Sequence, residues 1–290
     1  MKSKINIPNF MKKLFLPKNP DIATNANIML EEDTILQLEH LSMRFGGLLA
    51  VNDLSFSVKR GAIFGLIGPN GAGKTTVFNC ITQFYQSTRG TVHYRGSDGK
   101  TIMLNKIAVH NIIKHGITRT FQNVELVWEL SVLDNLMVAT TQFLKVDMVS
   151  QFLRLPNYQR KEKAMREKAT QILEVLGLAP YKDLPAFGLP YGILKKIEMA
   201  RALMNEPQLI ILDEPAAGLN DKETEELAET IKLIRDRLHT TIFLVEHDMG
   251  LVMSICDTVC AISFGKMLGI GTPSEIQANP VVREAYLGAE

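Results

Sequence analysis

Three cysteines are few for a chain of 290 residues, and they exclude a small fold held together by disulfides. Cys256 and Cys260 stand close together, but no second pair of ligands accompanies them, as a zinc site would require. No apolar run reaches the about 18 to 20 residues that cross a bilayer, and no apolar signal core begins the chain. We therefore expect small buried thiols at Cys80, Cys256 and Cys260, in a cytoplasmic chain that is soluble by itself.

The sequence also lacks an excess of one sign of charge. Lys and Arg number 32 and Asp and Glu number 31, which leaves a net charge of +1. No global electrostatic field therefore directs the chain to nucleic acid, which we do not expect as a partner. Hydrophobic residues make up 46% and charged residues 22%, and this balance is typical of folded globular proteins.

Residues 1–33 are expected to form an N-terminal extension. Pro8, Pro17 and Pro20 interrupt any helix there, and the apolar residues follow no sustained period. Several lysines precede the first acid, Asp21, with apolar residues between them, so contact with an anionic membrane surface is one interpretation. A flexible, solvated tail is the favoured one.

From Thr34 onward, short apolar runs alternate with longer helical patterns, which is typical of an α/β domain with a largely parallel sheet. The runs at 63–67, 209–212 and 242–245 are nearly continuous and aliphatic, as in central strands that are buried on both faces. Between residues 123 and 189 this alternation stops. Helices are predicted there at 133–144 and 161–178.

A phosphate-binding loop is predicted directly after the first of these strands. Residues 68–75 match G-x-x-x-x-G-K-[ST] in full and precede a helix that should begin near Lys74. Gly71 and Gly73 let backbone N–H groups approach phosphates, while Lys74 reaches the β and γ phosphates and the Thr75 hydroxyl binds Mg²⁺. A glycine turn without a ligand is the alternative, and the combination of strand, loop and helix disfavours it. The residues expected at the nucleotide are Gly68, Pro69, Asn70, Gly71, Ala72, Gly73, Lys74, Thr75 and Thr76.

A second magnesium ligand and a base for water are expected at the C-terminal end of a neighbouring parallel strand. The run 209–212 ends in Asp213 and Glu214. Asp213 is predicted to hold Mg²⁺ through its water shell, and Glu214 to act as general base. After the run 242–245, the His247 imidazole is predicted to hydrogen-bond the γ-phosphate. Solvated strand ends are the alternative interpretation, and the shared sheet edge disfavours it.

In this order, the motifs resemble those of the ATP-binding cassette family, over residues 36–271. The resemblance implies a P-loop NTPase of the ABC ATPase type, with a mostly parallel core sheet and flanking helices, an antiparallel β subdomain and a helical insert. It implies that Phe45 stacks on adenine and that His247 is the switch histidine. Gln122 is expected to sense Mg²⁺ and nucleotide, as a catalytic and metal-binding residue that abuts a transmembrane partner. Residues 217–220 resemble the D-loop of the family.

The signature of the family, LSGGQ, is replaced by LPYGI at residues 189–193. In the family this segment caps ATP bound to the opposite subunit, so Tyr191 and Gly192 are expected to contact nucleotide across a dimer. Gly192 still allows the backbone to approach phosphate. The serine hydroxyl and the glutamine amide are absent, and losing a hydrogen bond to a charged phosphate weakens closure by roughly 1.5 to 3 kcal/mol. We therefore predict pairing with a different cassette subunit, with a homodimer as the alternative.

The domain organisation follows from the same resemblance. Residues 1–33 are the extension, and residues 34–122 and 190–272 form the RecA-like nucleotide-binding core with its antiparallel subdomain. The helical subdomain is expected at 123–189, with the signature at its end, and a C-terminal helical tail at 273–290.

Finer features resemble the ATP-binding subunits of branched-chain amino acid transporters and of the closely related urea and amide importers. They are residues 44–47, the Tyr-Gly of the signature, 213–220, 246–249 and the ending 285–288. The resemblance implies ATP and Mg²⁺ as cofactors and ATP hydrolysis that drives uptake. It implies two polytopic permease subunits, a second cassette ATPase and, indirectly, a substrate-binding protein as partners. The expected location is peripheral, on the cytoplasmic face of the inner membrane.

Three other functions are less compatible with the sequence than a transporter ATPase. A soluble cassette ATPase that acts on DNA or the ribosome usually carries two cassettes, a long coiled coil or zinc-binding inserts, and the sequence has none of these. A regulatory ATP-binding module would lack the base or the loop lysine, and both are present. A P-loop kinase would not explain Gln122, Gly192 and His247 together.

Overall fold

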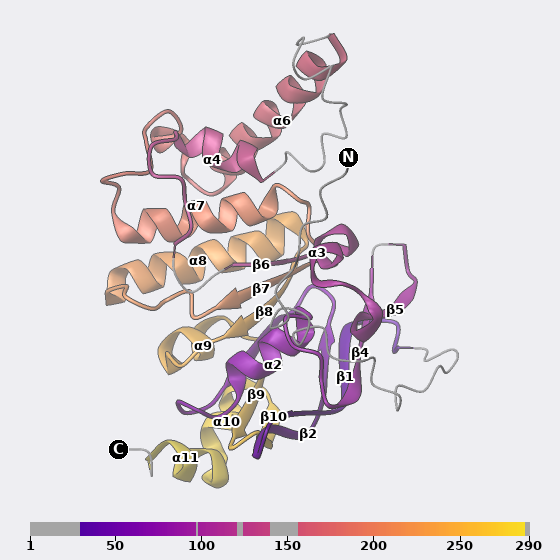
Figure 1. Ribbon diagram of the computed structural model, residues 1–290. Coiled ribbons are helices and arrows are strands. Elements are labelled where there is room, and N and C mark those ends of the chain that lie inside the picture. Colours follow the sequence, from indigo (N-terminus) through magenta and orange to yellow (C-terminus); the bar gives the residue numbers. More distant parts are fainter. Residues whose placement is uncertain (1–29, 97, 121–123, 140–155, 288–290) are drawn as a thin grey trace.

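The computed structural model has two β-sheets with helices packed against them and a helical region beyond α7 and α8 (Figure 1). It describes residues 30–96, 98–120, 124–139 and 156–287. Within these ranges, the parallel core sheet, the antiparallel sheet and the helical region form the fold class that the sequence predicts.

The larger sheet has six strands in the order β10-β9-β3-β8-β7-β6 in the described part of the chain. Neighbouring strands are parallel from β9 through β6, and β10 pairs antiparallel with β9. The strands are β3 (Ile63–Ile67), β6 (Ile117–Arg119), β7 (Leu209–Asp213), β8 (Thr241–Val245), β9 (Thr258–Ser263) and β10 (Lys266–Gly271).

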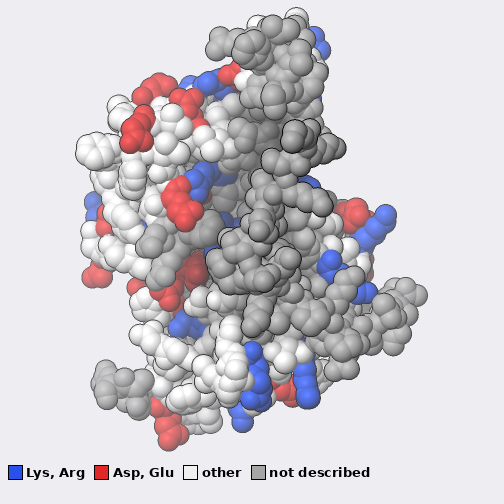
Figure 2. Space-filling view, in the orientation of Figure 1, with Lys and Arg blue, Asp and Glu red and all other residues white. Residues whose placement is uncertain are grey.

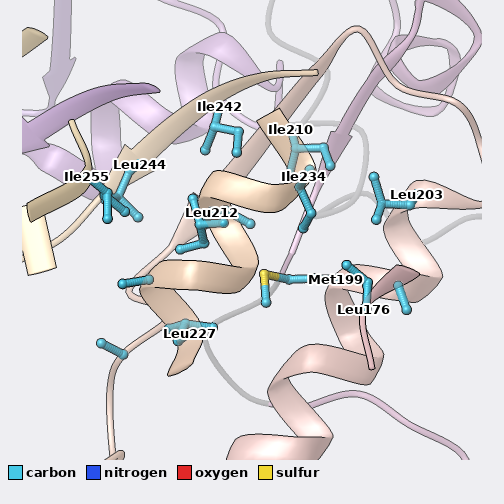
Figure 3. Close-up of a cluster of buried hydrophobic side chains, with 14 of the residues drawn as sticks. Leu176, Met199, Leu203, Ile210, Leu212, Leu227, Ile234, Ile242, Leu244 and Ile255 are labelled. Atoms are coloured by element: carbon cyan, nitrogen blue, oxygen red, sulfur yellow. The ribbon is translucent and has the colours of Figure 1, made fainter. Parts of the chain in front are cut away.

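Strands β3 and β8 are buried at every residue, which confirms the prediction of central strands. Successive side chains of a strand point to opposite faces, so each strand supplies two cores. Ile242 and Leu244 of β8 join the cluster beneath α7 and α8 (Figure 3). Phe243, between them, stacks with Phe64 on the opposite face, with ring centroids 5.5 Å apart.

One expectation about the sheet is wrong. The strand that ends in Asp213 is not a direct neighbour of the strand that leads into the phosphate loop, because β8 lies between β7 and β3. All three strands are parallel, so their C-terminal ends still meet at one sheet edge. Apolar runs of this kind predict buried strands, but they carry no information about which strand pairs with which.

The smaller sheet is antiparallel, with the order β2-β1-β4-β5. It packs over the phenylalanine face of the larger sheet through residues such as Phe56, whose ring centroid lies 5.0 Å from that of Phe64. Its strands are β1 (Thr34–Phe45), β2 (Leu48–Lys59), β4 (Arg89–Arg95) and β5 (Thr101–Met103).

The helices enclose the larger sheet and form the helical region. The α-helices are α2 (Lys74–Ile81), α3 (Val109–Ile112), α4 (Val132–Val138), α6 (Pro156–Val175), α7 (Tyr191–Leu203), α8 (Asp221–Leu238), α9 (Met249–Ile255), α10 (Pro273–Ala278) and α11 (Pro280–Leu287). Short 3₁₀ helices are η1 (Leu104–Lys106), η2 (Ile113–His115) and η3 (Ala179–Tyr181).

The helices predicted at 133–144 and 161–178 correspond to α4 and α6, with different bounds. α4 begins one residue earlier, and residues 140–144 lie outside the described residues. α6 begins at Pro156, since proline is tolerated in the first turn of a helix. It ends before Gly177, whose φ of +69° cannot continue a helix.

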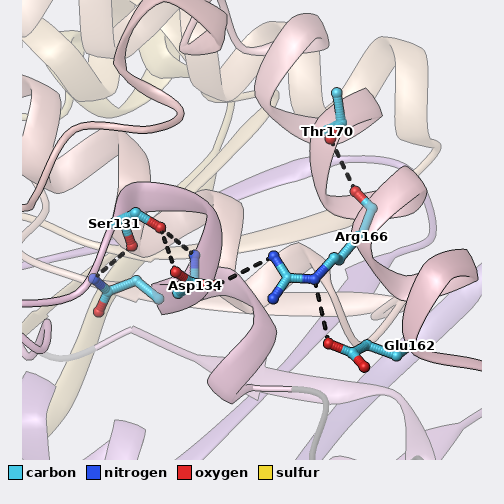
Figure 4. A network of polar contacts seen from close by, with 6 residues as sticks. Ser131, Asp134, Glu162, Arg166 and Thr170 are labelled. Atoms are coloured by element: carbon cyan, nitrogen blue, oxygen red, sulfur yellow. Dashed lines mark hydrogen bonds and ion pairs between the residues drawn. The ribbon is translucent and has the colours of Figure 1, made fainter. Parts of the chain in front are cut away.

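Polar contacts fasten α4 to α6 (Figure 4). Ser131 caps α4 by accepting a hydrogen bond from the Asp134 N–H at 3.0 Å. The Arg166 guanidinium of α6 lies 3.3 Å from an Asp134 carboxylate oxygen and 3.4 Å from one of Glu162. Asn135 is buried, and its side chain forms hydrogen bonds with the backbone of the preceding loop. These bonds hold that loop against α4.

The last residues of the predicted extension are packed against the smaller sheet. Leu30 is buried, and the Arg95 guanidinium of β4 donates hydrogen bonds to the carbonyl groups of Leu30, Glu31 and Glu32. Residues 1–29, with the lysines considered for membrane contact, lie outside the described residues.

The cysteines and the surface agree with the composition. Cys80, Cys256 and Cys260 are free and buried, as predicted, and burial raises the pKa of each thiol to about 12. No helix within the described ranges has the length and apolar character needed to span a membrane. On the described part of the face in Figure 2, side chains of both charges are interspersed.

Candidate active site

The phosphate loop connects β3 to α2, which begins at Lys74 as predicted. Two of its glycines are required by close contacts. A Cβ at Gly68 would lie 2.3 Å from the Ile262 carbonyl oxygen of β9, and one at Gly73 would lie 2.5 Å from the Ala50 carbonyl oxygen. Gly73 also has a φ of +102°, which side chains disfavour. The loop is therefore held between β9 and β2, with the N-terminus of α2 open to an anion.

Lys74, the first residue of α2, is buried, and its side chain reaches back to the start of the loop. Its ammonium group donates hydrogen bonds to the carbonyl oxygens of Gly68, at 2.6 Å, and Pro69, at 3.2 Å. Burial lowers the pKa of Lys74, and the carboxylates of Glu214, Glu246 and Asp213 act in the opposite direction. The ammonium is thus already removed from bulk water. Charged phosphate oxygens are stronger hydrogen-bond acceptors for it than the two carbonyl oxygens.

A cavity of about 360 Å³ opens beside the loop. The structure brings Phe45, part of the phosphate loop and Glu214 together in its lining. Phe45 is 40% exposed and its ring meets that of Tyr85 edge to face, with centroids 5.2 Å apart, so an aromatic surface at the cavity remains open to a planar base. The lining residues are Phe45, Leu48, Leu49, Ala50, Asn70, Gly71, Ala72, Gly73, Lys74, Thr75, Thr76, Glu214 and Phe264.

Phe264 is a lining residue that the sequence analysis did not identify. It is 89% exposed on the turn between β9 and β10 and has a φ of +46°. The turn is fixed because the Gly265 N–H donates to the Ala72 carbonyl at 2.9 Å and the Gly265 carbonyl accepts from the Asn52 N–H at 2.8 Å. In the sequence, only a Phe-Gly pair between two strands indicates this turn. Its contact with the phosphate loop is visible only in the fold.

Asp213 and Glu214 lie at the end of β7, at the same sheet edge. Burial, and secondly the Glu214 carboxylate, raise the pKa of Asp213 to about 6. Glu214 leaves the strand with a φ of +46°, and its N–H donates to the Val245 carbonyl of β8 at 2.8 Å. This backbone turn directs the Glu214 side chain into the cavity lining.

Glu246 is a second residue that the sequence analysis missed. Its carboxylate is fully buried and accepts three backbone hydrogen bonds. One comes from Ala216 at 2.9 Å, on the loop that follows Glu214, and the others come from His247 at 2.8 Å and Asp248 at 3.1 Å. Glu246 therefore holds the loop after β7 against the loop after β8. An acid at the end of a buried strand was the available signal.

His247 lies at this junction with its side chain half exposed. Its Nδ1 atom is 3.9 Å from a Glu214 carboxylate oxygen and 3.6 Å from one of Glu246. The imidazole is thus close to the predicted base and partly open to solvent. A side chain that hydrogen-bonds a bound phosphate needs such an open side.

The signature residues are placed away from this cavity. Tyr191 and Gly192 begin α7 and do not belong to its described lining. The Tyr191 ring covers Gly218 of the predicted D-loop, 3.3 Å from the position of a Cβ there. Ile193, at the position of the family's glutamine, packs against the core cluster. Contact of Tyr191 and Gly192 with nucleotide stays a prediction that requires a second subunit, and Gln122 lies outside the described residues.

The donor set fits Mg²⁺ held together with phosphate. Within the described ranges, no group of three or more His, Cys, Asp and Glu side chains could hold a metal by itself. The Thr75 hydroxyl and the Asp213 carboxylate are oxygen donors of the kind Mg²⁺ prefers, and Mg²⁺ is usually bound by one or two such groups plus substrate phosphates.

Comparison with known families agrees with the motifs. A family model described as ABC transporter matches residues 51–217. A second, described as Branched-chain amino acid ATP-binding cassette transporter, matches residues 266–290.

Named relatives are similar along most of their length. The chain is 45% identical to the high-affinity branched-chain amino acid transport ATP-binding protein LivG of Salmonella typhimurium, over 88% of this chain and 98% of that protein. It is 44% identical to LivG of Escherichia coli K12 and 43% identical to BraF of Pseudomonas aeruginosa, each over 88% of this chain and 98% of the relative.

Solved structures share the fold. The ADP conformation of MJ1267, an ATP-binding cassette of an ABC transporter, is 30% identical and superposes with a TM-score of 0.75, over 88% of this chain and 99% of that one. CbiO1 of Clostridium perfringens, part of the ABC transporter complex cbiONQ, is 26% identical with a TM-score of 0.72, over 89% of this chain and 100% of that one.

The role of Glu246 can be tested by replacing it with glutamine. Glu246→Gln turns one acceptor oxygen into a donor that faces a backbone N–H. We expect the free energy of unfolding to fall by about 1 to 3 kcal/mol, with a loss of ATPase activity. Chemical denaturation measures the first effect. The exposed acid Glu225, changed to Gln, is the control and should stay within about 0.5 kcal/mol of the parent. Equal stability of the two variants would contradict the role.

The raised pKa of Asp213 predicts a pH dependence of the nucleotide-free protein. Its folded pKa of about 6 lies above the ordinary value of 3.8, so the stability that it contributes is full below the ordinary value and is lost as the pH rises through 6. Asp213→Asn should therefore be more stable than the parent at pH 7.5, with a smaller difference at pH 5. Urea denaturation at both pH values measures this. Asp183→Asn removes an exposed carboxyl as a control. A difference that does not depend on pH would contradict the prediction.

Proposed function

The chain belongs to the ABC transporter family, and from this membership we propose that it is the ATP-hydrolysing subunit of an importer for branched-chain amino acids. The observation that carries the catalytic part is the convergence of the phosphate loop, Phe45 and Glu214 on one cavity. The cargo is supported by identity of 43–45% to LivG and BraF and by the match of residues 266–290. Urea and amides are the alternative cargoes.

Binding begins with exchange of partners at Lys74. The phosphates compete with the Gly68 and Pro69 carbonyl oxygens for its ammonium, while the backbone N–H groups of the loop and the N-terminus of α2 bind the phosphate oxygens. The exposed Phe45 ring stacks on the adenine base. Bound Mg²⁺ supplies charge neutralisation at the β and γ phosphates, and Thr75, Asp213 and Gln122 are the residues that would hold it.

Hydrolysis depends on Glu214 and His247. Glu214 accepts the proton of a water whose oxygen bonds to the γ-phosphorus, and the bond from that phosphorus to the β–γ bridging oxygen breaks, which yields ADP and phosphate. His247 hydrogen-bonds the γ-phosphate and remains close to Glu214. The buried Glu246 keeps both loops in position, so the two side chains act at fixed places.

The permease partner is proposed to dock near the end of β6. A cavity of about 410 Å³ lies there, lined by apolar groups such as Phe84 and Ile112 together with Arg119, Glu198 and Arg201. Arg119 is three residues before Gln122. A permease segment bound at this cavity would contact both the core and α7, so closing and opening of the ATPase pair would shift the membrane subunits between two states. We propose two such subunits and a peripheral position on the cytoplasmic face of the inner membrane.

The second ATPase subunit is proposed to be a different cassette protein. Ile193 packs in the core of its own chain and has no amide to offer a phosphate, and Pro190 has no hydroxyl. A partner that provides a complete signature would still close well over the phosphate loop of this chain, while the LPYGI segment caps the partner's ATP weakly.

The catalytic assignment predicts that two variants lose different steps, turnover in one and ATP binding in the other. Glu214→Gln should lower ATP turnover roughly 10²- to 10⁴-fold with nearly unchanged ATP affinity, because the general base is lost but the phosphate contacts remain. Lys74→Ala should instead weaken ATP binding. Steady-state ATPase assays and titration with ATP distinguish the two. Parental turnover in Glu214→Gln, or parental affinity in Lys74→Ala, would remove that residue from its role.

The partners can be identified by purifying the tagged chain, at native expression level, from detergent-solubilised membranes. We expect two polytopic permeases and a second, different cassette ATPase to elute with it. Recovery only from the soluble fraction, with ribosomes, nucleic acid or nothing bound, would contradict the transporter function.

The prediction of a different ATPase partner can be tested with the purified chain alone. Glu214→Gln with ATP should remain monomeric by light scattering, while the same chain with Pro190→Ser and Ile193→Gln should dimerise more readily. A tight homodimer without the signature changes would contradict the heterodimer.

A further inference from the structure

The turn between β9 and β10 carries a phenyl ring that the apolar core does not use. Phe264 is 89% exposed, more than any other large hydrophobic side chain in the described part of the chain, and it belongs to neither core cluster. An exposed ring of this size gains free energy when an apolar surface covers it. Packing within the chain does not account for this side chain, whereas a molecule bound beside it would.

The backbone holds this ring in a fixed place, in a strained conformation. Phe264 has a φ of +46°, which bulky residues rarely adopt. The next residue, Gly265, has a φ of +74°, and a Cβ there would lie 2.5 Å from the Ala50 carbonyl oxygen. The Gly265 N–H donates a hydrogen bond to Ala72, and the Asn52 N–H donates one to Gly265. Strained residues persist where the surrounding structure fixes them, and they are common at ligand-binding sites.

Strand β2 places this turn beside the expected adenine platform. Phe45 of β1 pairs with Leu48 of β2, and Ala50 is two residues further along β2, a distance of about 6.6 Å in a strand. The Ala50 carbonyl oxygen lies 2.5 Å from the position of a Cβ at Gly73 and also at the glycine that follows Phe264. The platform, the end of the phosphate loop and the exposed ring therefore lie along one short stretch of β2.

The cavity beside the phosphate loop has a polar part and an apolar rim. Lys74, the loop backbone and Glu214 supply the polar part. Phe45, Leu48 and Phe264 supply the rim, and their exposed fractions are 40%, 66% and 89%. A ligand that fits this lining has charged groups together with a flat, largely apolar ring system, as a nucleoside triphosphate has.

We propose that Phe264 is a second aromatic residue that contacts the nucleoside of ATP. The inference rests on the function proposed above, in which ATP is the ligand and Phe45 stacks on its adenine. Aromatic groups attract one another edge to face as well as stacked, so a second ring adds affinity for the nucleoside. Phe264 lines the cavity of its own chain, and the contact therefore forms without a second subunit. It acts on ATP binding and not on the chemical step.

The test removes the ring and keeps the turn. In the full chain carrying Glu214→Gln, so that ATP stays intact, Phe264→Asn should weaken the Kd for ATP with Mg²⁺ by about 3- to 10-fold, the effect of one aromatic contact. Asparagine tolerates a positive φ, so the Tm without nucleotide should not fall. The Kd for inorganic tripolyphosphate with Mg²⁺ should be unchanged, because it has no nucleoside. Phe264→Trp should retain the affinity for ATP.

A matched control is available in a second exposed phenylalanine. Phe187 is 77% exposed and lies outside the described lining of the cavity, so Phe187→Asn should leave the Kd for ATP unchanged. Fluorescence tests the contact directly. The chain has one tryptophan, Trp128, and ATP should change the emission of Phe264→Trp more than that of the parent or of Phe187→Trp.

Three results would overturn the inference. They are an unchanged Kd for ATP in Phe264→Asn, an equal loss of affinity for ATP and tripolyphosphate, and emission of Phe264→Trp that responds to ATP no more than that of the parent. The proposed function fails by other results. It fails if the Glu214→Gln chain binds no ATP, or if Lys74→Ala leaves the affinity for ATP unchanged.

Discussion

Burial of both faces of β3, β7 and β8 is the constraint on which the site depends. Each strand supplies one row of side chains to the cluster beneath α7 and α8 and another row to the cluster beneath the antiparallel sheet. Strands covered on both faces are joined through helices and run parallel, so their C-terminal ends meet at one edge. The phosphate loop, the pair Asp213 and Glu214, and His247 lie where those strands end. Burial of the strands in the apolar core therefore brings together the phosphate loop, the two acids and the histidine that ATP hydrolysis requires.

At that edge, the buried carboxylate of Glu246 fixes the position of the loop after β7 relative to the loop after β8. Three backbone N–H groups from two loops converge on it, and such bonds are stronger when the acceptor is charged. Lys74 balances part of this negative charge from the phosphate loop. The pKa of Asp213 is raised because its carboxyl group is buried and, secondly, because the Glu214 carboxylate lies close to it. The site is thus electrostatically incomplete without a bound cation.

Strand β9 and the turn that follows it belong to this arrangement as well. The Gly265 N–H of that turn donates a hydrogen bond to the Ala72 carbonyl, and the Ile262 carbonyl of β9 lies against Gly68. The phosphate loop is therefore held by β9 and its turn, which directly precede the residues 266–290 that match the branched-chain amino acid transporter model.

The sequence by itself determined the central strands, the phosphate loop and the acids after 209–212, because continuous aliphatic runs and fixed glycine spacings follow from local geometry and short-range burial. It also determined the family, through the order of these motifs. Only the tertiary structure decided that β8 separates β7 from β3, that Glu246 rather than a loop residue joins the two loops, and that Phe264 lines the same cavity as the phosphate loop. Those contacts join residues distant in the chain, and hydrophobic periodicity specifies which face of an element is buried but not which distant element covers it.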